Sequence, residues 1–128
     1  MRLLMVYFLI TFFSANCHAE EHKLHSDIHI FQGEKFEIEL KVNCPKSELT
    51  CNDVGYNAIN KKTGKKLQLK GQLLSNPTGD RQWYEFKNGK YLYELTADYT
   101  PSATPQERWV LNVIHDGKYI ASDEGNMY

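Results

Sequence analysis

The sequence predicts an all-β protein, an antiparallel meander of about six to eight strands that forms a small barrel or a sandwich and carries one disulfide. Three observations lead to this fold class. Apolar and polar residues alternate with a period of two along much of the chain, and glycine-containing dipeptides separate the alternating runs. Beyond residue 19, no segment keeps a helical period for more than a turn or two.

The clearest strand covers Lys35 to Val42, where apolar and polar residues alternate without a break. This pattern is typical of a strand with one face in the core and the other in solvent. A shorter candidate lies upstream, where Ile28 and Ile30 flank His29. In the longer strand the predicted core positions are Phe36, Ile38, Leu40 and Val42.

Three dipeptides downstream predict hairpin turns: Thr63-Gly64, Asn88-Gly89 and Asp116-Gly117. If each is a two-residue turn, apolar and aromatic residues meet on one face of the sheet, which supports a meander. The strand pairs expected from these turns are Val54 with Leu73, Tyr56 with Gly71, Ala58 with Leu69, Tyr84 with Tyr93, Phe86 with Tyr91, Val113 with Ile120, and Ile114 with Tyr119.

The beginning of the chain is typical of an export signal. A short basic start is followed by an apolar run from Leu3 to Phe13, and small or polar residues then lead to Ala19. A run of eleven residues is too short to span a bilayer, so we expect no integral membrane protein. We expect a signal peptide over residues 1–19 and a single exported β domain over residues 20–128; acylation of Cys17 as a lipoprotein is the less favoured alternative.

Removal of this signal would leave two cysteines, Cys44 and Cys51, which we expect to form a disulfide across the connection between two strands. No Asn-X-Ser/Thr glycosylation acceptor occurs, which slightly favours a bacterial periplasmic location over eukaryotic secretion. The net charge of −1 lacks the basic excess of a dedicated nucleic-acid-binding protein, so we expect no nucleic-acid partner. No catalytic motif is present, and we expect the protein not to be an enzyme.

Two features are candidates for binding a partner. Four lysines surround the predicted turn at Thr63-Gly64 and form a local positive patch, which suits another protein or an anionic component of the envelope. Trp83 lies opposite Tyr84 and Phe86 in its strand, which favours an exposed position and a role as an interface anchor. The plainer interpretations are a hairpin kept soluble by its charge and a tryptophan in the core. The four lysines are Lys61, Lys62, Lys65 and Lys66.

A metal site is a further alternative. Cleavage after Ala19 would leave Glu20, Glu21 and His22 as the first three residues, with His25 close behind. A free amine, two amides and an imidazole place four nitrogens in a square plane, the geometry that Cu(II) and Ni(II) prefer. We therefore expect no cofactor unless the mature chain begins at Glu20, and a polar N-terminus without metal is the plainer interpretation.

A small exported β domain with one disulfide and hairpins at Asn88-Gly89 and Asp116-Gly117 resembles bacterial periplasmic inhibitor and immunity-type proteins, including the lysozyme inhibitors. The resemblance is architectural, so it assigns no residue a role. It implies a non-catalytic exported binding module, an inhibitor or immunity protein against an envelope-acting hydrolase. The alternatives are periplasmic handling of copper or nickel through the N-terminal histidines and a structural factor in envelope assembly.

Overall fold

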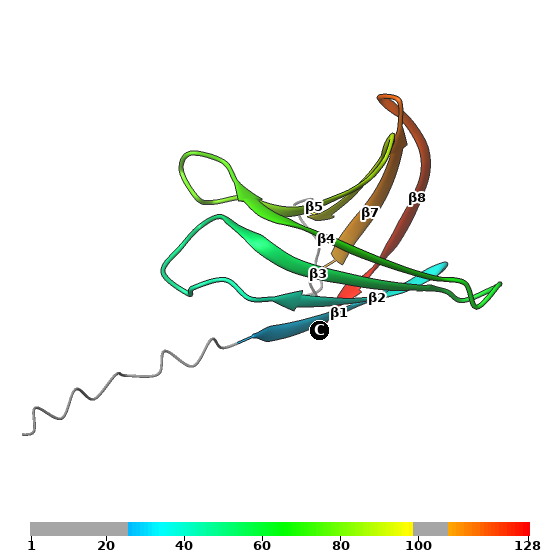
Figure 1. The fold of residues 1–128 in the computed structure, drawn as a ribbon, viewed down its shortest axis with the longest axis horizontal. Helices are drawn as coiled ribbons and strands as arrows, with labels where there is room; N and C mark the ends of the chain where they lie inside the picture. The colour runs from blue at the N-terminus through cyan, green and yellow to red at the C-terminus, as the bar shows by residue number, and fades with distance from the viewer. Residues whose placement is uncertain (1–25, 99–107) are drawn as a thin grey trace, which may run out of the picture.

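The computed structural model describes residues 26–98 and 108–128, and over these ranges the chain forms eight antiparallel strands and no helix (Figure 1). Each strand pairs with the next, and β8 returns to pair with β1, so the sheet closes into a barrel. The predicted all-β meander is confirmed, and the structure is a barrel rather than a sandwich. The strands are β1 (Asp27–Gly33), β2 (Phe36–Val42), β3 (Cys51–Asn60), β4 (Lys66–Ser75), β5 (Gln82–Asn88), β6 (Tyr91–Ala97), β7 (Arg108–His115) and β8 (Lys118–Met127).

The alternating residues fill the inside of the barrel. Along β2 the apolar positions are inward and the charged positions are exposed, as the period of two predicts. Tyr56 packs on Phe86 with ring centroids 4.6 Å apart, and Tyr84 packs on Trp109 with centroids 5.9 Å apart. The core therefore contains aromatic rings in contact with one another together with aliphatic side chains. Its largest fully buried side chains are Tyr56, Phe31, Phe86, Ile38, Leu40, Leu95, Leu111 and Val54.

Two of the three predicted hairpin registers are wrong by two residues. In the β3–β4 hairpin, Tyr56 pairs with Leu69 instead of Gly71, because the loop has four residues rather than two. The side-chain oxygen of Asn60 accepts hydrogen bonds from the backbone of Lys62 and Thr63, at 3.0 and 3.1 Å, and fixes this longer loop. The corrected pairs are Val54 with Gly71, Tyr56 with Leu69, and Ala58 with Leu67.

In the β5–β6 hairpin, Phe86 pairs with Tyr93 rather than Tyr91, and Tyr84 pairs with Leu95. The turn is formed by Gly89 and Lys90, with Gly89 at a φ of 61°. A glycine with positive φ at the first central position is the pattern of a type II′ turn. A register shift of two residues leaves every side chain on its predicted face, so the predicted core positions of these strands are still correct.

The third hairpin turns at Asp116 and Gly117, as predicted, and both have positive φ, at 49° and 74°. The pairing of Ile114 with Tyr119 is confirmed. The pairing of Val113 with Ile120 is wrong, because the register shifts beside Ile114 and Val113 faces Ala121 instead. Ile120 is therefore the extra residue of this irregularity.

The barrel closes at a short seam between β1 and β8, where three pairs of residues face each other. Asp123, which is 3% exposed, stabilises this closure from β8. Its carboxylate accepts three backbone hydrogen bonds from the β1–β2 turn, from the N–H groups of Glu34, Lys35 and Phe36 at 3.0, 2.9 and 2.9 Å. One buried carboxylate thus accepts hydrogen bonds from three consecutive backbone N–H groups of the turn and connects the last strand to the first hairpin.

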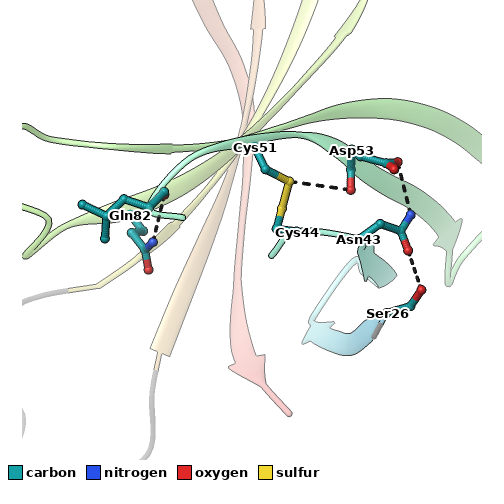
Figure 2. The surroundings of a disulfide bond; sticks show 7 residues. Ser26, Asn43, Cys44, Cys51, Asp53 and Gln82 are labelled. Carbon is teal, nitrogen blue, oxygen red and sulfur yellow. Dashed lines mark hydrogen bonds between the residues drawn. A yellow bond between two sulfur atoms is a disulfide. The ribbon is translucent and has the colours of Figure 1, made fainter. Parts of the chain in front are cut away.

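The predicted disulfide joins Cys44 to Cys51, with their Cα atoms 5.6 Å apart, and clamps the connection between β2 and β3 (Figure 2). Asn43 beside it donates from its side chain to Asp53 at 3.1 Å. Gln82 donates to the carbonyl oxygen of Leu49 at 3.1 Å, which attaches the disulfide loop to β5. We call this the disulfide end of the barrel, and the opposite end, with the β1–β2, β3–β4, β5–β6 and β7–β8 turns, the hairpin end.

Candidate functional site

The β3–β4 hairpin projects from the hairpin end (Figure 1). It carries the four predicted lysines. All four are exposed, but Lys61 also donates from its ammonium group to the carbonyl oxygen of Gly33 at 2.6 Å. Its backbone N–H donates to the carbonyl oxygen of Lys35 at 2.9 Å. Lys61 therefore fastens the hairpin to the β1–β2 turn, while Lys62, Lys65 and Lys66 present their charge to solvent.

Trp83 lies on the outer face of β5, half-buried, while its neighbours Tyr84 and Phe86 point into the core. Its indole N–H donates to a carboxylate oxygen of Glu85 at 3.1 Å. By register it sits between Leu74 of β4 and Thr96 of β6. Trp83 is thus an outer-face residue with partial cover.

The structure does not bring Trp83 and the lysines together. Trp83 pairs with Leu74, near the end of β4, whereas Lys66 begins that strand. A strand rises about 3.3 Å per residue, so the two positions are roughly 26 Å apart along β4. They are two separate surfaces, and a single small partner would not cover both.

The predicted metal ligands Glu20, Glu21, His22 and His25 lie outside the described residues, as does the predicted signal peptide. Within residues 26–98 and 108–128, no cluster of three or more histidine, cysteine or acidic side chains is arranged to hold a metal ion. Those same ranges contain no helix of the length and apolarity needed to cross a membrane.

A cavity of about 410 Å³, which no residue pattern predicted, lies at the hairpin end, and we call it the barrel mouth. It forms because β4 pairs with β5 only from Gly71 onward within the described strands, so the two strands diverge toward their hairpins. Gly71 permits the close approach before the divergence, since a Cβ there would lie 2.1 Å from the carbonyl oxygen of Glu85. The mouth is lined by Phe36, Tyr56, Ala58, Asn60, Lys65, Lys66, Leu67, Tyr91, Tyr93, Leu111, Val113, Ile120 and Ala121.

The mouth is aromatic at its floor and cationic at its rim. Tyr56 is buried there between Phe86 and Tyr93, and its ring centroid is 5.8 Å from that of Tyr93. Burial raises the pKa of Tyr56 above the ordinary tyrosine value, with a smaller contribution from Tyr93, and burial also raises the pKa of Tyr93. Both phenols are therefore neutral at physiological pH. At the rim, Lys65 and Lys66 are the only lining residues that carry charge.

A second hollow lies on the outer face of β2–β4. Glu37 and Glu39 border it on one side and Lys66 on the other, with Asn57 and Gln68 between them. It presents charges of both signs to solvent. Such a surface is typical of a solvated strand face, so it adds no chemistry of its own.

No protein-family model, curated protein or solved structure matches the chain. The class of protein therefore rests on the barrel and its surfaces. A closed barrel with an aromatic-lined mouth at one end and a lysine-bearing hairpin beside it is an architecture suited to binding.

Proposed function

We propose that the protein is a non-catalytic binding module exported to the periplasm, an inhibitor or immunity protein that blocks an envelope-acting hydrolase. The observation that carries this proposal is the β3–β4 hairpin, a projecting positively charged loop whose conformation is fixed before any partner arrives. The disulfide and the apolar run at the start of the chain support export.

The hairpin is fixed by hydrogen bonds at its base and at its tip. At the base Lys61 bonds to the β1–β2 turn, and at the tip the side chain of Asn60 accepts two backbone hydrogen bonds. The N–H of Gly64 closes the loop by donating to the carbonyl oxygen of Asn60 at 2.8 Å. A loop already in its bound conformation loses little entropy on binding, which favours tight inhibition by a small contact area.

The charge of the hairpin favours an acidic surface on the partner. Hydrolases that cleave glycosidic bonds usually place carboxylates in a cleft, and a rigid cationic loop complements such a cleft in both shape and charge. On this proposal Lys62, Lys65 and Lys66 steer association, and Trp83 belongs to a different surface that this partner does not need to cover.

The test is capture and inhibition. The purified exported protein is immobilised, a periplasmic extract is passed over it, and the retained protein is identified and assayed for hydrolysis with and without the free module. We expect retention of a hydrolase whose turnover stops when the module is added. Retention of no hydrolase, or of one that keeps its full turnover in the complex, contradicts the proposal.

Charge variants sharpen this test. Replacing Lys62, Lys65 and Lys66 with glutamine should slow association about tenfold or more at low salt and leave dissociation nearly unchanged. The difference should shrink at 0.15 M salt, where exposed charges are screened beyond about 8 Å. The matched control removes the same charge elsewhere, at the exposed Lys41, Lys46 and Lys87, and should leave the association rate within about twofold.

A further inference from the structure

We propose that the barrel mouth binds a single-chain amphipathic anion, with the apolar chain inside the mouth and its oxyanion at Lys65 and Lys66. The proposal goes beyond inhibition by the hairpin, because it concerns a small ligand in a cavity rather than a protein on a surface. It rests on the shape of the mouth, the polarity of its walls and the sign of its charge.

The walls are apolar where the chain would lie. Ala58 and Leu67 of β3 and β4 form one side, and Val113 and Ala121 of β7 and β8 form the other. At the opening Tyr91 is 40% exposed and Ile120 is 55% exposed, which are large values for apolar side chains that line a cavity. Apolar surface around a concave site marks a place where a ligand would remove it from water.

The charge at the rim selects the head group. None of the lining residues is acidic, and the two ionised ones are lysines of the same hairpin. Lys66 pairs with the outward Ile59 and also borders the outer hollow that holds Glu37 and Glu39, so Lys65 is the cation that belongs to the mouth alone. By register Lys65 pairs with Asn60, so the amide of Asn60 adds a neutral hydrogen-bonding group at the same point of the rim. A carboxylate or a phosphate would meet two cations there, whereas a cationic head would be repelled.

The wall formed by β6, β7 and β8 is held in place before a ligand enters. The turns of the β5–β6 and β7–β8 hairpins are joined by a backbone hydrogen bond from Asp116 to Lys90 at 3.3 Å. Directly below, the rings of Tyr91 and His115 pack with centroids 4.4 Å apart. Because the opposite wall is fixed by Lys61 and Asn60, the mouth is a preformed site, and binding needs no large rearrangement.

The volume sets the size of the ligand. A cavity of about 410 Å³ lies in the lower part of the range found for small-molecule sites, roughly 300–1,000 Å³. It accepts one alkyl chain or a small aromatic body, and it is too small for a lipid with two long chains. Decanoate and decyl phosphate are therefore suitable probes, because they share one chain and differ in the oxyanion.

The experiment is calorimetry on the purified exported protein with four probes that share the same chain: decanoate, decyl phosphate, decanol and decyltrimethylammonium. We expect one anion per protein, bound at least about tenfold more tightly than decanol, with the cation weakest. The tighter of the two anions identifies the head group. Backbone NMR shifts should be largest at Ala58, Ala121 and Tyr93. Equal affinity for all four probes, or no binding of either anion, overturns the proposal.

Two variants locate the ligand. Lys65→Gln with Lys66→Gln should reduce the preference for the anion over decanol to about threefold or less, while Lys70→Gln with Lys87→Gln, which removes the same charge outside the mouth, should preserve it. Ala121→Phe should abolish binding of every probe by filling the mouth from an exposed position, where folding is not at risk. Anion binding that survives Ala121→Phe, or a preference unchanged by loss of Lys65 and Lys66, places the ligand elsewhere and refutes the proposal.

Discussion

Replacing Asp123 with asparagine should open the seam at which the barrel closes. The carboxylate is buried, and each of its oxygens accepts at least one hydrogen bond from the β1–β2 turn. An asparagine of the same shape has one acceptor oxygen and one NH₂ group, which is a donor. If its oxygen serves Lys35 and Phe36, its NH₂ group faces the N–H of Glu34, and two donors then point at each other.

The magnitude follows from the three bonds. Hydrogen bonds to a charged group contribute about 1.5–3 kcal/mol each and neutral ones about 1 kcal/mol. In the variant the bonds from Lys35 and Phe36 become neutral and weaken, and the bond from Glu34 is lost, which leaves its N–H unsatisfied. The turn is partly exposed, and water can recover part of this loss. We therefore expect Asp123→Asn to lower the free energy of unfolding by about 2–4 kcal/mol. For a domain of roughly this size, that corresponds to a fall in Tm of about 8–16 °C.

Urea denaturation of wild type and variant measures this loss, and hydrogen exchange at Glu34, Lys35 and Phe36 shows where it arises. The control is Asp116→Asn, which removes an exposed carboxylate 4.0 Å from Lys90 and keeps a residue that tolerates positive φ. It should cost less than about 1 kcal/mol. If Asp123→Asn unfolds with the same free energy as the control, Asp123 does not hold the seam and the reasoning is refuted.

The remaining predictions concern the disulfide, the two tryptophans and alkaline pH. Cys44→Ser should lower the free energy of unfolding by about 2–3 kcal/mol in a denaturation experiment, and a titration of the native exported protein that finds two thiols would refute the bridge. Trp83→Ala should lower the free energy of unfolding by about 1 kcal/mol, because this side chain is half-buried on the outer face. Trp109→Ala removes a side chain that packs against the core and should lower it by about 3–5 kcal/mol. Equal losses of stability in the two variants would contradict the placement of these side chains. Burial raises the pKa values of Tyr56 and Tyr84 above 10, so as the pH rises these phenols ionise first in the unfolded chain. The free energy of unfolding should therefore hold below pH 10 and fall as the pH rises beyond it. Ultraviolet titration should show both phenols ionising only as the protein unfolds.

The alternation of residues determined the faces of the strands, and the turns determined which residues pair. Phe86 was correctly expected on the inner face, because a side-chain period of two is a property of the strand itself. The predicted cross-strand partner of Phe86, Tyr91, is wrong because the sequence Asn88-Gly89 is compatible with more than one turn. Here Gly89 takes the first central position, which moves the register by two. The register thus depended on whether Asn88-Gly89 or Gly89-Lys90 forms the turn, which the residue types left undetermined.

The candidate site likewise has features that local sequence predicts and features that it does not. The lysines and the outward position of Trp83 follow from local sequence, because exposure is set by strand parity and by turn chemistry. The barrel mouth does not, since its lining residues come from six strands, several of them far apart in the chain. The one local signal was Gly71, an isolated glycine inside a strand, which marks a close backbone approach but does not reveal the divergence that follows.

The two ends of the barrel differ in their cross-links and in the apolar surface that they expose. At the disulfide end, within the described residues, a covalent bond clamps the β2–β3 connection and the hydrogen bond from Gln82 to Leu49 joins that connection to β5. The hairpin end is closed on one side by Asp123 and left open between β4 and β5, where aromatic and apolar side chains meet water. Exposed apolar surface at a rigid opening is costly unless something covers it, whereas the cross-links at the other end act on the stability of the whole sheet. We therefore place both proposed binding sites at the hairpin end, and we expect the disulfide end to contribute by holding the strands that form the mouth.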